Sequence, residues 1–564
     1  MTALKVALKG PSLLLNPSLN KGSAFTRKER EEFGLMGLLP IQSNSLEEQQ
    51  NRAYEQYQNH QSNLSLRTPQ NWVLFYSLII RHLKEMFPVI YTPTEAEAIA
   101  NFSHLFRRPE GIWLSPSDEE HMEQSLINVM DGQEFDLVVV SDGEAILGIG
   151  DQGSGAIGIS SAKGMIYTLV AGVDPARILP VALDVGTNNK DLLEDDMYLG
   201  WRHERMRGET YLKFVDKFVS LIRKHQPNAL LHFEDFGVDN AQKLLDTYRD
   251  EHPVFNDDVQ GTGAVTLATL QAALIVTGGK LSEQRIISFG AGSAGLGIAR
   301  QLRDAAILLD GVSEEEANKL IFLVDKHGLL KQGISDKIRD GIDRGFVRKD
   351  RDEKDIGEWP EGENDLLEVI KRVKPTVLIG TSTVAGAFNE EIVRAMAEGT
   401  ERPIILPLSN PTSKCEAHPK DLMKWTNGKA LIATGSPYDP VDMPGSSEKY
   451  EVAECNNALV YPGLGMGAIV SKADRVTDKM IVAACKALGD MSPARKDPKK
   501  PLLPDFEDAQ AVNMEIALAV VKAAIDEGIS DLKVPEEDLR SYLEERTWKA
   551  EYAEYKYDPE GIAF

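Results

Sequence analysis

The pattern of hydrophobic and polar positions divides the chain into a mainly helical start and a longer region where short strands alternate with helices. Near the start, Thr26 and Glu29 have the spacing of a capping box, which predicts the beginning of a helix. An amphipathic helix is predicted by large side chains that recur every three or four positions, namely Trp72, Phe75, Leu78, Ile79 and His82. Pro88 is expected to end this helix, and residues 89–94 to form a strand end and a turn.

From residue 136 onward, apolar runs rich in β-branched residues alternate with helical stretches. Strands are expected at 137–140, 178–183, 230–233, 285–289, 320–325, 376–379 and 404–408. Helices are expected at 160–171, 206–225, 260–276, 296–305 and 508–527. Continuous apolar strands are typical of parallel sheets that are covered on both faces, so the sequence predicts an α/β fold.

Composition narrows the possible classes of protein. A chain of 564 residues is too long for one ordinary core, so two or more domains are expected. The formal net charge of -25 argues against nucleic acid or an anionic membrane as a partner. Three cysteines do not form a disulfide framework, and we found no apolar run long enough for a membrane span. The start of the chain has no clear targeting pattern, so we expect a cytoplasmic protein, with the mitochondrial matrix as the alternative.

A glycine-rich loop at residues 290–295 lies between an expected strand and an expected helix, the context of a dinucleotide-binding turn. Gly290 is expected to make the tight turn, Gly292 to let the backbone approach a pyrophosphate, and Gly295 to allow close packing of the helix. Ser293 and Ala294 complete the loop at the positive end of that helix. The alternative is a plain glycine turn in an α/β sheet.

Asp325 ends the next expected strand, 35 residues after Gly290, where about 20 is usual. A carboxylate there accepts hydrogen bonds from the adenosine ribose and repels a 2′-phosphate, which favours NAD over NADP. Lys326, Arg339 and Arg344 lie close in sequence and could weaken that preference. The charged stretch 340–365 is expected to be a solvated surface loop.

Two adjacent pairs of carboxylates, Glu234–Asp235 and Asp257–Asp258, each follow an aromatic residue in an otherwise apolar stretch. Like charges this close are costly to bury unless a cation neutralises them, and Mg²⁺ or Mn²⁺ prefers such oxygen ligands. Neighbouring residues of a strand point to opposite faces, so one pair can share an ion only where the strand ends and the chain turns. Gly237 is expected to permit that turn. The alternative to a metal site is that these carboxylates are helix caps or surface charges. That alternative could account for one such pair, but it fits two aromatic-flanked pairs poorly.

Several longer motifs resemble those of malic enzymes in order and spacing, from about residue 17 to 525. They are Leu19–Phe25, Tyr91–Thr94, Gly148–Gly153, Phe233–Gly237, Phe255–Asp258, Ser409–Thr412, Asn456–Asn457 and Tyr461–Gly463. The resemblance implies oxidative decarboxylation of L-malate to pyruvate and CO₂, with NAD or NADP and a divalent metal. It also implies a homodimer or a homotetramer.

The resemblance also implies roles for individual residues. Lys163 matches the general base and Tyr91 the general acid, while Glu234, Asp235 and Asp258 match the metal ligands. Asn410 matches an asparagine of the substrate and cofactor site, and one or both of Asn456 and Asn457 match another that binds substrate. Asp257 is expected to orient a metal ligand or Lys163. A base must be neutral, so we expect burial and the nearby cation to depress the pKa of Lys163.

With these roles the predicted architecture is a helical N-terminal region, a central parallel α/β domain and a Rossmann-type domain. The expected segments are a helical domain (1–109), a substrate and metal domain (110–256), an NAD(P)-binding domain (257–456), a return to the central domain (457–529) and a polar C-terminal tail (530–564).

One departure from the family pattern bears on the product. Many malic enzymes carry an arginine two residues after the Asp142–Gly143 turn, where this chain has Ala145. Either another cation replaces that charge, such as Arg107 or Arg108, or the substrate preference differs. The alternatives are a malolactic enzyme that converts L-malate to L-lactate and CO₂ with bound NAD, a catalytically silent NAD-binding protein, and a metal-independent hydroxyacid dehydrogenase. Gln70 falls where fumarate-activated relatives have an arginine, so fumarate activation is not expected.

Overall fold

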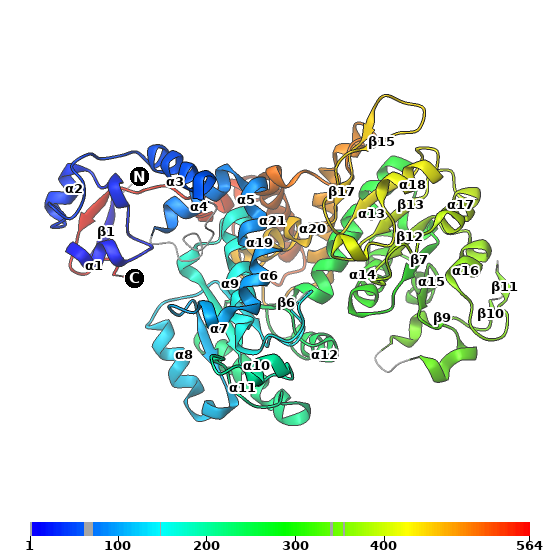
Figure 1. Cartoon of the computed structure of the whole chain (residues 1–564), viewed down its shortest axis with the longest axis horizontal. Coiled ribbons are helices and arrows are strands. Elements are labelled where there is room, and N and C mark those ends of the chain that lie inside the picture. Colours follow the sequence, from blue (N-terminus) through cyan, green and yellow to red (C-terminus); the bar gives the residue numbers. More distant parts are fainter. Residues whose placement is uncertain (1–2, 61–70, 147, 339–341, 353–355, 564) are drawn as a thin grey trace.

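The computed structural model describes residues 3–563 apart from 61–70, 147, 339–341 and 353–355, so Gln70 and Arg339 lie outside the described residues. Two parallel sheets organise the chain. The first has the order β2-β4-β3-β5-β6 and the second the order β17-β14-β13-β12-β7-β8-β9, with only the β8–β9 pair antiparallel. Figure 1 shows the sheets in separate lobes, with the nucleotide-type lobe on the right and the two termini together on the left. The predicted α/β class is confirmed.

The seven predicted strands agree closely with β3, β4, β5, β7, β8, β12 and β13, whereas β2, β6, β9, β14 and β17 were not predicted. The first sheet consists of β2 (Ile112–Leu114), β3 (Leu137–Ser141), β4 (Ile178–Leu183), β5 (Leu230–Phe233) and β6 (Val254–Asn256). The second consists of β7 (Ile286–Phe289), β8 (Ile321–Asp325), β9 (Gly328–Leu329), β12 (Val377–Gly380), β13 (Ile404–Pro407), β14 (Leu431–Thr434) and β17 (Ala453–Glu454). Along β3, Leu137 and Val139 enter one hydrophobic core while Val138 and Val140 enter another. Both faces of this strand are therefore buried, which explains its continuous apolar sequence.

Helices cover the faces of both sheets and form most of the N-terminal region. Up to the first carboxylate pair they are α1 (Gly10–Leu15), α2 (Arg27–Glu32), α3 (Leu46–His60), α4 (Trp72–Arg81), α5 (Leu83–Ile90), α6 (Thr94–Ala100), α7 (Phe102–Leu105), α8 (Met122–Met130), α9 (Ala156–Ile166), α10 (Lys190–Glu194) and α11 (Gly208–His225). The remainder are α12 (Val238–Tyr248), α13 (Thr262–Thr277), α14 (Ser293–Asp310), α15 (Glu314–Lys319), α16 (Leu366–Val373), α17 (Glu390–Gly399), α18 (Pro419–Trp425), α19 (Tyr461–Ser471), α20 (Asp478–Asp490), α21 (Ala509–Asp526) and α22 (Leu539–Arg546).

The helix predicted to end at Pro88 is interrupted at a different place. His82 leaves the helical conformation (φ -127°, ψ 37°), which separates α4 from α5, and α5 continues through Pro88 to Ile90. Pro88 lies in the last turn of α5, where its missing N–H removes only one hydrogen bond near the end of the helix. The segment expected as a strand end is therefore the end of α5, a turn, and the start of α6.

Two further expectations need correction. The charged stretch 340–365 is not simply a solvated loop, because its described part buries Phe346 and Trp359 and contains the strand pair β10 (Arg351–Asp352) and β11 (Gly357–Glu358). The helix expected at 160–171 begins earlier, at Ala156, and ends with a π-helical turn, Tyr167–Ala171.

The segment Asp257–Thr277 has the length and apolar composition of a membrane span, which the sequence analysis overlooked. Most of it is buried inside the protein as α13 and the turn before it. It packs against α14 and α20, as a core helix of a large domain does.

The two ends of the chain form a small lobe together. The strand β1 (Leu4–Val6) pairs in parallel with β18 (Tyr555–Tyr557), so the segment expected as a polar tail ends in a sheet. The predicted capping box of Thr26 and Glu29 is confirmed. The buried Glu29 carboxylate also accepts from the Lys21 ammonium (2.6 Å) and from the Tyr555 backbone N–H (3.0 Å). This carboxylate therefore links the N-terminal and C-terminal segments.

Replacing Glu29 with alanine is expected to open this lobe, because the Lys21 ammonium would remain buried without its carboxylate. Breaking a buried ion pair in this way costs about 3–5 kcal/mol. Hydrogen exchange of the β1 and β18 amides, together with thermal unfolding, measures the effect. Glu31→Ala is the matched control, because Glu31 forms only an exposed pair with Arg27. Equal exchange in the two variants would contradict the prediction.

Candidate active site

The two carboxylate pairs meet at one edge of the first sheet. The strands β5 and β6 are parallel neighbours with Phe233 opposite Asn256, so the residues that follow each strand emerge side by side. One carboxylate oxygen from each of Glu234, Asp235 and Asp258 lies within 4.8 Å of the other two. The three predicted metal ligands are thus brought together.

The turn that joins these side chains is made by Asp235 itself. Its φ of +53° is left-handed, a conformation that is uncommon outside glycine, and it follows directly on Glu234 at the end of β5. The prediction that Gly237 supplies the turn was wrong, because Gly237 has φ -52° and ψ 141°. A Cβ at Gly237 would lie 2.2 Å from Glu144 Oε2, so a side chain there would require the Glu144 carboxylate to move.

The donor set fits a hard divalent cation. Burial and repulsion from Glu234 and Asp257 raise the pKa of Asp258 well above its usual value. The Asp258 carboxylate also accepts the backbone N–H of Asp235 (2.8 Å), which holds the two loops together. The three carboxylates supply only oxygen ligands, which Mg²⁺ and Mn²⁺ prefer. Their negative charges repel one another, and a divalent cation would relieve that repulsion.

Lys163, on α9, lies directly beside these carboxylates and is almost completely buried. Its Nζ is 2.5 Å from Asp257 Oδ2 and 3.1 Å from Glu234 Oε1. Burial lowers the pKa of Lys163, but Asp257 and Glu234 outweigh it and hold the pKa well above its usual value. The expectation of a depressed pKa therefore does not hold for the protein alone, because it left out the two carboxylates that contact the ammonium.

A second group of possible ligands, His232, Glu234 and Asp257, also has donor atoms within 4.8 Å of one another. The Lys163 ammonium contacts two of the three, Glu234 and Asp257, and already supplies the positive charge there. A divalent cation is therefore expected at Glu234, Asp235 and Asp258 rather than in this second group.

Tyr91 directly follows α5 and lies close to Lys163. The Lys163 Nζ is 5.5 Å from the centre of the Tyr91 ring. The next helix, α6, approaches α9 closely at Gly158, where a Cβ would lie 2.6 Å from Ile99 Cγ1. Burial raises the pKa of the Tyr91 phenol, so Tyr91 stays protonated and can donate a proton.

The predicted asparagines have different positions. The Asn457 amide donates to Asp257 Oδ2 (2.5 Å), the same oxygen that contacts the Lys163 ammonium. The Asn456 side chain caps the following turn and donates to Glu454 (3.0 Å). Asn410 lies beyond the end of β13, where its exposed side chain accepts a hydrogen bond from the Ser436 hydroxyl.

The glycine loop has the geometry of a dinucleotide-binding turn. Gly290 has φ +109° and lies against Thr381, at the point where strand order reverses between β7 and β12. A side chain at Gly295 would collide with the Gly290 carbonyl, whereas Gly292 faces open space. The open side of Gly292 at the start of α14 suits a pyrophosphate.

Helix α14, which follows the glycine loop, also contacts the segment that follows Asp258. A Cβ at Gly297 of α14 would lie 2.6 Å from the Val259 carbonyl, one residue after Asp258. This close approach fixes the glycine loop relative to the carboxylates. Asp325 lies at the end of β8, next to β7, as predicted for a residue that contacts the ribose.

Ala145 lies beside the first pair of proposed metal ligands, since its backbone N–H donates to the Asp235 carbonyl (3.2 Å). Arg107 and Arg108, the replacement cations considered above, are exposed between α7 and β2. Two other guanidinium groups contact the turn that precedes Ala145: Arg205 donates to the Asp142 carbonyl (2.9 Å) and Arg207 pairs with Glu144 (2.5 Å).

Three buried residues of the site had no predicted role, namely His232, Tyr167 and Tyr461, although Tyr461 begins one of the matched motifs. The ring of Tyr461 lies 4.6 Å from Lys163 Nζ, and Tyr167 donates to or accepts from His232 (3.0 Å). A signal for His232 was available, because a histidine in an apolar parallel strand, two residues before Glu234, shares a face with that carboxylate.

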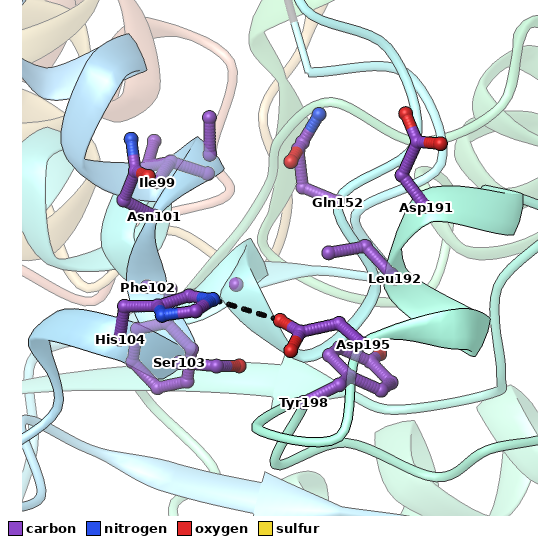
Figure 2. Close-up of a pocket in the computed structure, with 12 residues that line it drawn as sticks. Ile99, Asn101, Phe102, Ser103, His104, Gln152, Asp191, Leu192, Asp195 and Tyr198 are labelled. Atoms are coloured by element: carbon purple, nitrogen blue, oxygen red, sulfur yellow. Dashed lines mark hydrogen bonds and ion pairs between the residues drawn. The ribbon is translucent and has the colours of Figure 1, made fainter.

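A separate hollow of about 170 Å³ lies between α6–α7 and the segment around α10. In Figure 2 the His104 ring reaches across it toward the Asp195 carboxylate, and the two groups are 2.9 Å apart. None of the predicted catalytic residues lines this hollow, so it does not mark the active site.

Comparison with known proteins gives a consistent result. The family description "Malic enzyme, N-terminal domain" matches residues 68–249, and "Malic enzyme, NAD binding domain" matches residues 259–525. An NAD-dependent malic enzyme of Sodalis glossinidius is 46% identical over 97% of this chain and 96% of its own, and one of Aliivibrio fischeri is 44% identical over 98% of each. A solved malic enzyme of Entamoeba histolytica shares the fold, with TM-score 0.55 and 22% identity over 91% of this chain and 90% of that chain.

Proposed function

Because this chain belongs to the malic enzyme family, we propose that it oxidises and decarboxylates L-malate to pyruvate and CO₂. NAD is the proposed hydride acceptor, and Mg²⁺ or Mn²⁺ the proposed cation at Glu234, Asp235 and Asp258. The observation that carries the proposal is the position of Lys163, which contacts Asp257 and Glu234 at the edge where those ligands converge. A hydroxyacid needs such a base next to such a cation.

The chain's own residues supply both proton transfers. Lys163 takes the proton of the C2 hydroxyl as hydride leaves C2 for the nicotinamide. A bound cation would polarise that hydroxyl and neutralise Glu234, which removes one of the charges that hold Lys163 protonated. Loss of CO₂ from the resulting oxaloacetate leaves an enolate, and the Tyr91 phenol donates its proton to C3 to give pyruvate. Asp257 orients Lys163 through its 2.5 Å contact.

The test is absorbance at 340 nm with purified protein, L-malate, Mn²⁺ and NAD, followed by assays of pyruvate and lactate. One NADH per pyruvate supports the proposal. Lactate without net NADH would identify the malolactic reaction instead, which the names of the relatives do not favour. Activity that survives complete removal of the cation would support a metal-independent dehydrogenase, and no turnover a silent NAD-binding protein.

Replacing Asp325 with alanine is expected to shift the cofactor preference toward NADP. Loss of a charged hydrogen bond of about 1.5–3 kcal/mol weakens NAD use by about 10- to 100-fold, and the repulsion of a 2′-phosphate disappears. The kcat/KM values for NAD and NADP measure both changes. Asp336→Ala, which alters an exposed residue of the same lobe, is the control. An unchanged ratio would exclude Asp325 from the ribose site.

We also propose that the protein forms a homodimer or homotetramer in a reducing compartment such as the cytoplasm. Self-association is supported by exposed apolar side chains on the lobe that contains β1 and β18, namely Leu15, Met36, Leu38 and Ile41. Free Cys415, Cys455 and Cys485 support a reducing compartment. Light scattering of the purified protein measures its mass.

A further inference from the structure

A buried chain of polar side chains lies behind the proposed metal ligands. The Tyr167 hydroxyl is 3.0 Å from His232 Nδ1, and His232 Nε2 is 2.8 Å from Glu234 Oε2. His232 has no exposed surface and Glu234 is almost completely buried. Neither Tyr167 nor His232 has a part in the proton transfers described above.

The direction of the second hydrogen bond follows from the chemistry of its partners. An ionised carboxylate only accepts hydrogen bonds, so His232 Nε2 must carry the hydrogen that it shares with Glu234. This holds whether the ring is neutral or protonated. In the neutral ring Nδ1 is then the acceptor, and the Tyr167 hydroxyl is the donor that fixes this tautomer.

The backbone and the surrounding rings hold His232 in this position. His232 and Glu234 are two residues apart at the end of β5, so their side chains leave the strand on the same face. Three aromatic rings, those of Tyr167, Phe255 and Tyr461, lie edge-on to the imidazole with centroids 5.5–5.6 Å away. The ring cannot rotate away from the carboxylate without disturbing this packing.

We propose that His232, held by Tyr167, is a positioning residue that fixes the orientation of the Glu234 carboxylate for binding of the divalent cation, an inference that rests on the proposed function. With Oε2 engaged by His232, the other oxygen, Oε1, faces Lys163 at 3.1 Å. Each carboxylate oxygen has two lone pairs, so Glu234 can accept from His232 and still ligate a cation. Without His232, only the Lys163 contact at Oε1 would hold the carboxylate, which could then rotate so that Oε2 turns away from Asp235 and Asp258.

The experiment measures Mn²⁺ binding directly, by electron paramagnetic resonance of free Mn²⁺, in full-length protein without malate or NAD. His232→Leu removes the N–H donor, whereas His232→Gln keeps an N–H at nearly the same reach. Tyr167→Phe keeps the imidazole and removes only the hydroxyl that orients it. NAD binding by each variant, followed by fluorescence, reports whether the rest of the protein is intact.

We expect His232→Leu to bind Mn²⁺ about 10- to 100-fold more weakly, because groups that orient metal ligands have effects of this size. His232→Gln should stay within a few-fold of the parent, and Tyr167→Phe should lie between the two. In turnover assays, saturating Mn²⁺ should restore most of the kcat of His232→Leu, which a general folding defect would not allow.

Equal Mn²⁺ affinity in the parent and His232→Leu would overturn the positioning role and leave the proposed function intact. Equal losses in His232→Leu and His232→Gln would also overturn it, since the shared loss could not come from the N–H donor. If the parent itself bound no Mn²⁺, the metal-dependent function would fail as well.

Discussion

Replacing Lys163 is expected to lower kcat for malate oxidation by about 10²- to 10⁴-fold, the range typical of a general base. The most informative variant is Lys163→Arg. A guanidinium keeps the positive charge beside Asp257 and Glu234 but does not give up its proton near neutral pH. Lys163→Ala would also leave two buried carboxylates without their cation. The arginine variant therefore separates loss of the base from loss of the ion pair.

The partial reactions distinguish the role of Lys163 further. Decarboxylation of added oxaloacetate does not need a proton taken from the C2 hydroxyl, so it should fall much less than malate oxidation in Lys163→Arg. NAD affinity should stay near that of the parent. Lys213→Arg, the same substitution at an exposed lysine of α11, is the matched control. Malate oxidation within a few-fold of the parent would remove Lys163 from the role of base.

The parts of the site that the sequence predicted follow from local rules. Glu234 follows β5 directly and Asp258 lies two residues after the end of β6, and parallel neighbours bring such residues together at one edge. Gly290 and Gly295 have the spacing of a known turn between a strand and a helix, and both are required by close contacts. The seven predicted strands match the structure almost to the residue because their apolar runs are buried on both faces, whereas five other strands of the two sheets, β2, β6, β9, β14 and β17, were not predicted.

The missed features depend on contacts between distant segments. Asn457 contacts Asp257, which lies 200 residues away in sequence, whereas Asn456 caps a local turn. The left-handed turn at Asp235 and the charged state of Lys163 arise from neighbours on other elements, so no local pattern reveals them. The break at His82 is likewise not marked by a helix-ending residue, and Pro88 stays within the last turn of α5, where it removes only one hydrogen bond.

Replacing Asp258 with asparagine is expected to abolish turnover and weaken Mn²⁺ binding by more than about 100-fold, since a direct ligand matters more than the groups that orient it. The same substitution should stabilise the cation-free protein. Burial and repulsion from Glu234 and Asp257 raise the folded-state pKa of Asp258 above its unfolded value. The stability from this group is therefore present at low pH and lost as pH rises through the folded pKa.

Thermal unfolding in a chelator, followed across pH, checks this sign. The difference in Tm between Asp258→Asn and the parent should grow in favour of the variant as pH rises, because asparagine never acquires the unfavourable charge. Added Mn²⁺ should reverse the order, since a cation at about 100 times its Kd stabilises the parent by about 2.7 kcal/mol and the variant much less. Asp239→Asn, an exposed position in the first turn of α12, should show neither effect. The contrary result is a parent that stays more stable than Asp258→Asn in chelator at every pH. The three carboxylates would then not destabilise the cation-free protein by mutual repulsion, and the assignment of the cation to them would lose its main physical support.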